Sequence, residues 1–396
     1  MIVTKRTTLL CIWYLLLSTA NLLLAPAQAN DRGPRPHHYI CINGKYIDDL
    51  SDCGQEFDRV AILIPAFSDQ AGLGLNVATV LNLQLFNTLQ KSPTPNPQKV
   101  SFGNATIFWR AEPLSEPTQR GAARAAETNL EPTQFVLWGT ASAYAGGVFV
   151  QARLSLPAIK TARRVRREVW ELTLPEKAGG SILSLDVPAR QYAFEPIVLD
   201  NDIVQKYSSP AALKIYRDKS LKESVGSLEG GDFKAVGHEI DGEWLSQPVH
   251  GWLPLPELAK QTSEIIEFTG GLIRIFRSDW NGATTLLRKV LEHPSTPTSI
   301  RIDTLLYLGL AAEKQQRSGR AEIEQAYNLN PLSQASASYL IMSAFSDYKR
   351  ATSSLERKAA VDRIGSLLEQ NSFLFPRDSK WFSEIDTAYL RVAGAH

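Results

Sequence analysis

Apolar and polar residues alternate from Ala212 to Leu258, and glycine-containing pairs interrupt the alternation at short intervals. These pairs are Gly230-Gly231 and Asp241-Gly242. An Asp-Gly pair favours a type I′ turn, because both central residues of that turn have positive φ. A period of two with closely spaced turn signals predicts short antiparallel strands joined by tight turns. We therefore expect a small all-β unit here, with one hairpin turn at Asp241-Gly242.

The chain begins with a basic pair, Lys5 and Arg6, followed by an apolar run from Leu9 to about Ala25 and a small-residue Ala27-Gln28-Ala29 segment. This order is typical of a secretory signal peptide, and we expect cleavage after Ala29. The alternative is an uncleaved membrane anchor, but the run is barely long enough to span a bilayer. We expect a periplasmic or secreted mature chain with no later membrane span.

Removal of the leader leaves Cys41 and Cys53, and an even pair in an exported protein predicts one disulfide. The alternative is two free buried thiols. The chain of 396 residues exceeds one ordinary core, and its net charge of +1 provides no general attraction to nucleic acid or membrane. The basic run from Lys160 to Arg167 is a local exception. It predicts a solvated turn or hairpin edge, and a polyanion site is the alternative.

Region 30–200 combines strand and helix patterns. The near-continuous apolar run Arg59–Phe67 predicts a strand buried on both faces. In 74–91, apolar residues from Val77 to Leu89 form one helical stripe, from which Leu83 departs. Further strands are expected at 105–109, 134–139, 147–154 and 167–174, and a second helix at 118–130.

Three features of this region resemble the amino-terminal domain of the TolB family. They are Pro65-Ala-Phe67 at the end of the opening strand, the helical segment Ala78–Leu81, and a hairpin made by Val136–Gly139 and Val148–Ala152. The resemblance implies an α+β module that makes protein contacts in the cell envelope and performs no chemistry.

The alternating stretch resembles a bacterial SH3-like domain, which implies a small all-β barrel at 207–258 that binds a ligand. The segments that carry the resemblance are Leu213–Tyr216, Val225–Val236, Asp241–Leu245 and His250–Leu253. The first loop departs from the family, because Arg217–Ser220 replaces a common Gly-Pro. That loop shapes the ligand groove, so the family's specificity is not carried over.

Aromatic residues are the candidate ligand-binding residues of this unit. Tyr216, Trp244 and Trp252 would line one face, and grooves lined in this way bind extended peptides. The alternative is that Trp244 and Trp252 belong to the core, and the family resemblance places at least one of them there.

Region 264–396 has almost no strand signal. The segments Phe268–Phe276 and Trp280–Pro294, with small Gly271 and Ala283 between large apolar residues, resemble a tetratricopeptide repeat. Further helix pairs are expected at 305–312 with 321–331 and at 335–348 with 355–370, before a capping helix at 378–392. Such units stack because no single pair buries its apolar face alone. The alternative is an unrelated helical bundle.

Motifs that carry catalysis are missing from the sequence: there is no G-x-S-x-G elbow, Walker loop or H-E-x-x-H. Gly72-Leu-Gly74 lacks the remainder of a phosphate loop and predicts a loop before a helix. His37 and His38 lack a third zinc ligand. His238 and His250 lie near Asp241 without a placed nucleophile, and we interpret them as surface histidines.

The sequence thus predicts a multidomain fold: signal peptide 1–29, αβ domain 30–200, SH3-like barrel 207–258 and helical repeats 264–396. The function that it favours is an exported, non-enzymatic adaptor for protein or peptide partners in the bacterial cell envelope, without cofactor or metal. The alternative is a peptidoglycan-binding module of a wall-processing system. An enzyme is a third and less favoured hypothesis.

Overall fold

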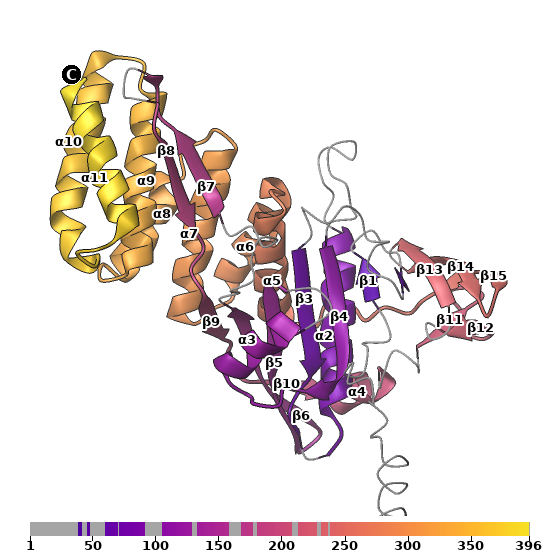
Figure 1. Cartoon of the computed structure of the whole chain (residues 1–396). Helices are drawn as coiled ribbons and strands as arrows, with labels where there is room; N and C mark the ends of the chain where they lie inside the picture. Colours follow the sequence, from indigo (N-terminus) through magenta and orange to yellow (C-terminus); the bar gives the residue numbers. More distant parts are fainter. Residues whose placement is uncertain are drawn as a thin grey trace, which may run out of the picture. The chain divides into compact units, whose positions relative to one another are not determined.

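The computed structural model describes residues 39–41, 46–47, 60–69, 71–91, 105–128, 133–157, 168–176, 180–207, 213–227, 231–236 and 238–395. A sheet-containing amino-terminal region precedes a helical carboxy-terminal region, so the fold is mixed α and β (Figure 1). The expectations for the leader, for His37 and His38, for the Lys160–Arg167 run and for a bond to Cys53 lie outside the described residues.

An eight-stranded mixed sheet organises the amino-terminal region, in the order β10-β6-β5-β3-β4-β1-β2, with β9 also paired to β6. Its strands are β1 Tyr39–Cys41, β2 Tyr46–Ile47, β3 Val60–Ala66, β4 Ala105–Pro113, β5 Phe135–Tyr144, β6 Gly147–Leu156, β9 Arg190–Ala193 and β10 Ile197–Asp200. The strand predicted at 59–67 and the hairpin β5–β6 are confirmed. β3 runs parallel to both β4 and β5.

Alternate residues of β3 enter two different cores. Ile62 and Ile64 pack with helix α2 (Gly74–Lys91), whereas Ala61 and Leu63 pack with helix α3 (Gln119–Thr128). Because successive strand residues point to opposite faces, the two helices cover the two faces of the sheet. β3 is buried along its whole length, as the apolar run predicts.

Helix α2 is buried on all sides, which the single apolar stripe did not predict. Leu83, outside that stripe, is fully buried. The cause is a second layer of protein beyond the sheet: the guanidinium of Arg274 on α5 (Ser263–Phe276) donates to the carbonyl oxygen of Leu89. Amide side chains of α2 also bond the segment that precedes α5. Gln84 Nε2 donates to Glu257 O over 2.9 Å, and Asn87 Nδ2 to Pro256 O over 3.2 Å.

A second sheet of five antiparallel strands has the order β12-β11-β15-β14-β13. Its strands are β11 Lys214–Tyr216, β12 Ser224–Ser227, β13 Gly231–Val236, β14 Glu239–Trp244 and β15 Gln247–Trp252, and helix α4 (Asn201–Lys206) precedes it. Among the described residues this path is open, with β12 and β13 at its ends. A small all-β sheet is therefore present, and closure into a barrel is not seen in this part of the chain.

The hairpin turn predicted at Asp241-Gly242 was wrong. Both residues lie inside β14, where Asp241 pairs with His250 and Gly242 with Val249. The two-residue turn is Leu245-Ser246, whose φ values of 48° and 63° are both positive, as a type I′ turn requires. The register of β14 on β15, which places Trp244 opposite Gln247, decides where the chain turns.

Seven α-helices follow in the described carboxy-terminal region. They are α5, α6 Trp280–Glu292, α7 Thr298–Lys314, α8 Arg320–Leu329, α9 Gln334–Arg350, α10 Ser354–Asn371 and, after a short 3₁₀ turn, α11 Lys380–Gly394. The predicted pairs are confirmed as contacting neighbours: α5 with α6, α7 with α8, and α9 with α10. Gly271 permits the first contact, since an added Cβ would lie 2.6 Å from Leu287.

Candidate functional site

Tyr216 and Trp252 lie directly opposite each other on β11 and β15, and Glu239 on β14 lies opposite Trp252 on its other side. Directly opposed residues project to the same face of a sheet, whereas neighbours along one strand project to opposite faces. The three side chains therefore form one row across three strands. Both aromatic residues of the row are half-buried.

Two further rows extend the same face. Asp241 lies opposite His250, and Glu243 lies opposite Pro248. His250 Nδ1 is 3.8 Å from an Asp241 carboxylate oxygen, and the two side chains are 75% and 81% exposed, so this pair is solvated. We call this surface the outer sheet face; it is made of Tyr216, Trp252, Glu239, Asp241, Glu243, Pro248 and His250. It combines two aromatic rings with three carboxylates.

Trp244 does not belong to the outer sheet face. It alternates with Glu243, on the side of β14 that carries the buried Ile240. A Cβ added to Gly226 would lie 3.2 Å from the Trp244 ring, and Trp244 packs against the core. The expectation of one face shared by three aromatic residues thus holds for Tyr216 and Trp252. For Trp244 the structure supports the alternative position, in the core.

His238 holds Trp252 in place. The two rings stack with their centroids 4.8 Å apart and 5° between their planes. His238 Nδ1 lies 3.0 Å from the carbonyl oxygen of Leu253, and the backbone N–H of Leu253 donates to the carbonyl oxygen of His238 over 2.7 Å. His238 Nε2 is 3.7 Å from the carboxylate of Glu257. His238 is thus half-buried and packed, while His250 is the exposed histidine.

The first helices of the three pairs, α5, α7 and α9, form what we call the first-helix face, and strands of the same chain pack against it (Figure 1). Tyr192 and Phe194, in and after β9, pack edge-to-face on Phe268 of α5, with centroids 4.8 and 6.1 Å away. Trp170, on the hairpin of β7 (Glu168–Thr173) and β8 (Ile182–Asp186), lies 5.7 Å from the ring of Tyr339 on α9.

Polar contacts reinforce this packing. Asp303 on α7, with a side chain only 2% exposed, accepts hydrogen bonds from the guanidinium of Arg190 and, over 2.6 Å, from the hydroxyl of Tyr192. Burial, followed by the Asp303 charge, raises the pKa of Tyr192 well above its ordinary value. Trp381 Nε1 on α11 donates to Ser184 O over 2.8 Å. The first-helix face is therefore occupied within the chain itself.

The glycine segment before α2 binds its own carboxylate. Asp69 accepts hydrogen bonds from the backbone N–H groups of Leu73 and Gly74, the second over 2.8 Å. These are the donors that a phosphate would use at a helix N-terminus. The prediction of a loop before a helix is confirmed.

Two further findings concern only the described residues. No three His, Cys, Asp or Glu side chains among them are grouped so as to hold a metal ion. None of the described helices has the length and apolar character needed to cross a membrane.

The acidic row of the outer sheet face was not identified from the sequence. In the sequence, Glu239, Asp241 and Glu243 are spaced two positions apart, the spacing of one face of a strand. The pairing of β14 with β15 shows that these carboxylates lie on the same face as Trp252. Comparisons with protein-family models, curated proteins and solved structures found no match to the chain.

Proposed function

We propose that the chain is an exported, non-enzymatic adaptor of the bacterial cell envelope whose outer sheet face binds a protein or peptide partner. The observation that carries this proposal is the row formed by Tyr216, Trp252 and Glu239. Aromatic rings provide contact area at a low cost in side-chain entropy, and the adjacent carboxylates favour a partner with positive charge.

An SH3-like assignment of the five-stranded sheet is part of this proposal. The sheet has a three-strand meander, β13-β14-β15, whose last strand returns to β11. Gly251 supports the close pairing of β15 and β11, because an added Cβ would lie 2.5 Å from the carbonyl oxygen of Tyr216. The Gly251-Trp252 pair lies in one of the four segments on which the sequence resemblance rests.

We also propose that the helix pairs are tetratricopeptide-like repeats. Their first helices begin at residues 263, 298 and 334, which gives spacings of 35 (298 − 263) and 36 (334 − 298) residues. The repeat length typical of this class is about 34 residues. Because the first-helix face is filled by β7, β8 and β9, these repeats hold the amino-terminal region of their own chain and serve as a rigid support for the outer sheet face.

Capture of partners by the exported chain tests the adaptor function. The chain would be expressed with its leader, purified from the periplasm and incubated with periplasmic extract, beside the variants Trp252→Ala and Leu332→Ala. Leu332 is 72% exposed and lies between α8 and α9, so its variant is a control for loss of a surface apolar group. We expect partners that bind the wild type and Leu332→Ala but not Trp252→Ala. Equal capture by all three would contradict the proposal.

Binding to peptidoglycan is the second candidate, because aromatic rings beside carboxylates also suit a glycan-bearing peptide with free amino groups. Purified sacculi would be sedimented with the same three proteins. Pelleting that Trp252→Ala abolishes would favour the cell-wall module, and no pelleting would exclude it. The mass of the exported chain tests the leader, since cleavage after Ala29 predicts a product that begins at Asn30.

A further inference from the structure

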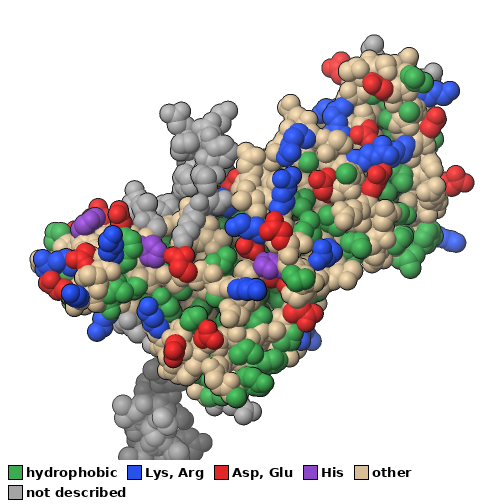
Figure 2. All heavy atoms as spheres, turned by 180° about the vertical axis from the view of Figure 1, so that it is seen from behind, with side chains coloured by type: hydrophobic (Ala, Val, Ile, Leu, Met, Phe, Trp, Pro, Cys, Tyr) green, Lys and Arg blue, Asp and Glu red, His purple; other side chains and the backbone are tan. Residues whose placement is uncertain are grey.

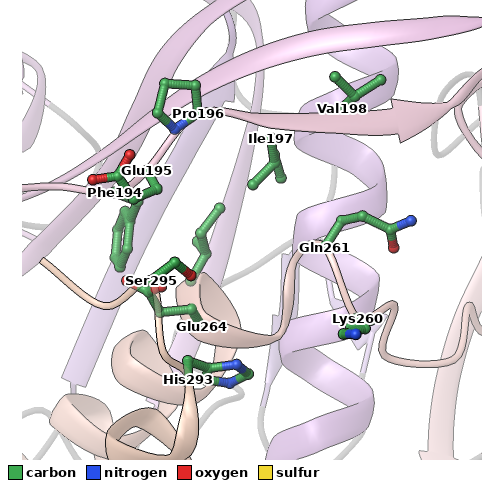
Figure 3. Close-up of a pocket in the computed structure, with 11 residues that line it drawn as sticks. Phe194, Glu195, Pro196, Ile197, Val198, Lys260, Gln261, Glu264, His293 and Ser295 are labelled. Carbon is green, nitrogen blue, oxygen red and sulfur yellow. The ribbon is translucent and has the colours of Figure 1, made fainter.

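A cavity of about 630 Å³ lies away from the outer sheet face, between strand β10, the start of helix α5 and the loop after α6 (Figure 3). Its lining includes Ile197 and Val198 from β10, Lys260 just before α5, Glu264 from the start of α5, and His293 from the loop. These residues come from three separate parts of the sequence. The cavity is therefore a product of the fold and has no sequence motif.

The cavity runs along an edge of the eight-stranded sheet. β10 is the end strand and pairs with β6 on one side. Ile197 and Val198 are neighbours in β10, so their side chains point to opposite faces of the sheet. Figure 3 draws Ile197 directed toward the labelled residues around α5 and Val198 directed away from them, although both residues line the cavity. A cavity that touches both residues extends along β10. Figure 2 shows hydrophobic side chains gathered at the lower part of the face it draws, where Figure 1 places the ends of β6 and β10.

Only part of this edge is covered by other described elements. β9, which lies before β10 along β6, is covered by the contacts of Arg190 with Asp303 and of Tyr192 with Phe268. In β10, Val198 remains 39% exposed, and none of the described strands pairs with the edge of β10 opposite β6. An unpaired strand edge beside a cavity is the arrangement by which proteins add an extended peptide to a sheet.

Glu264 supplies a chemical preference. The residue is 8% exposed, and its Oε1 atom is buried with no hydrogen-bond partner. Burial raises the pKa of this carboxyl, the charge of His293 lowers it, and that of Glu195 raises it, with a net rise. His293 is itself engaged, since its Nε2 lies 2.7 Å from the carboxylate of Glu267. A buried carboxylate oxygen without a donor is unfavourable, and a donor from a ligand would satisfy it.

We propose that this cavity binds a lysine or arginine side chain carried by an extended peptide segment that lies along β10, with the cationic group bonded to Glu264. Glu195, also at the cavity, adds negative charge. The site is separate from the outer sheet face, so either proposal can fail while the other stands.

Lys260 provides an opposing charge that sharpens the prediction. It lines the cavity and is exposed, so its positive charge opposes the entry of a ligand cation. Removing that charge is therefore expected to strengthen binding, whereas removing the charge of Glu264 is expected to weaken it. A general loss of folding would weaken binding in both variants, so it would not produce these opposite changes in affinity.

The affinity should depend on pH through Glu264. The charged groups that act on it are His293 after α6, Glu195 before β10 and Arg301 on α7, and Lys260 before α5 also lines the cavity. Because the carboxyl takes up its proton at a higher pH than an ordinary glutamate, binding of a cation is expected to decline as the pH falls, and earlier than with an ordinary glutamate. Glu264→Gln is expected to remove that part of the pH dependence.

Fluorescence anisotropy with labelled pentapeptides tests the site on the full exported chain. One set has lysine at its centre between Val, Thr, Ile and Ser residues, and a matched set has norleucine there; free n-butylamine is the competitor without a backbone. We expect the lysine set to bind about tenfold to hundredfold more tightly than the norleucine set, as a charge-assisted bond implies. Glu264→Gln should abolish that difference, and Lys260→Gln should increase it.

Three results would overturn the proposal. The first is that no lysine peptide binds or that the norleucine set binds equally well, which would remove the cation preference. The second is unchanged affinity in Glu264→Gln, which would remove the assigned residue. The third is that n-butylamine competes as strongly as the peptides, which would show that β10 contributes nothing and that the cavity holds a small amine alone.

Discussion

The imidazole of His238 stacks on the indole of Trp252, with 4.8 Å between the ring centroids and 5° between the ring planes. The same histidine is tied to Leu253 through its ring and its backbone. The indole is thereby fixed before any partner arrives, and a fixed ring loses less entropy on binding than a mobile one. We therefore expect Trp252 to contribute the most binding free energy of the residues on the outer sheet face.

The two tryptophans of the five-stranded sheet should respond differently to truncation. Trp252→Ala is expected to abolish partner capture with little change in amide exchange across β12–β15. Trp244→Ala removes a ring packed against Gly226 and the core, and should destabilise the sheet by about 2–3 kcal/mol, somewhat less than for a fully buried ring. Hydrogen exchange measured by mass spectrometry checks both. Similar exchange in the two variants would contradict their separation onto opposite faces.

The turn at Leu245-Ser246 offers a stabilising change. Both residues have φ values in the left-handed region, 48° and 63°, although neither is glycine or asparagine. A side chain in this region costs roughly 1 kcal/mol. Leu245→Asn combined with Ser246→Gly gives the pair that type I′ turns favour. The double variant should raise the free energy of local opening of β14 and β15 by about 1 kcal/mol, which slows their amide hydrogen exchange. Faster exchange in the double variant would show that the turn is of another type.

Asp241-Gly242 shows why a local signal was not enough to place this turn. The pair favours a turn wherever it occurs, but it lies in β14 because Trp244 pairs with Gln247 and Ile240 is buried. Burial of one face of the strand sets the register, and the register places the turn. The helix pairs were predicted more accurately, because the spacing of their small and large apolar residues is local in sequence.

Contacts between distant segments were beyond the sequence patterns. Glu264 reads as an ordinary acidic residue in the first turn of a helix, and only the approach of β10 and His293 reveals a buried, unpartnered oxygen. In the same way, nothing in the helical periodicity indicated that the first-helix face would be filled by β7, β8 and β9. Both features depend on which distant segments come into contact. Such contacts produce no periodic pattern and no motif in a single sequence.

The pair of Arg190 and Asp303 should be required for the packing of β9 on α7. Asp303→Asn keeps the shape of the side chain but leaves the guanidinium without its counter-charge. Loss of one partner of a buried pair costs 3–5 kcal/mol, and since the Arg190 side chain is 32% exposed we expect about 2 kcal/mol. Thermal unfolding and exchange in β9 and α7 measure the loss. Glu384→Gln, which removes an exposed pair with Lys380, is the control and should change little.

Gly309 should tolerate no side chain, because α7 and α8 approach each other there. A Cβ at this position would lie 2.4 Å from Ile323 and 2.8 Å from the carbonyl oxygen of Gly319. Overpacking of this kind costs about 1–3 kcal/mol, and the backbone oxygen cannot move aside as a flexible side chain would. Gly394→Ala is the matched control, since nothing lies within 4 Å of its added Cβ. A melting temperature lowered in both variants alike would refute the close approach.

Glu264→Gln should stabilise the free protein at neutral pH. The pKa of Glu264 is raised in the folded chain, mainly by burial, so the folded state holds its proton more tightly than the unfolded state does. The contribution of this group is then fully present below the unfolded pKa and is lost as the pH rises through the folded pKa. Glutamine imitates the protonated form at every pH. We expect it to add roughly 1 kcal/mol at pH 7, a gain that shrinks as the pH is lowered toward the ordinary range of glutamate. Urea unfolding of both proteins across this range measures the difference, and a gain that instead grew on acidification would contradict the raised pKa.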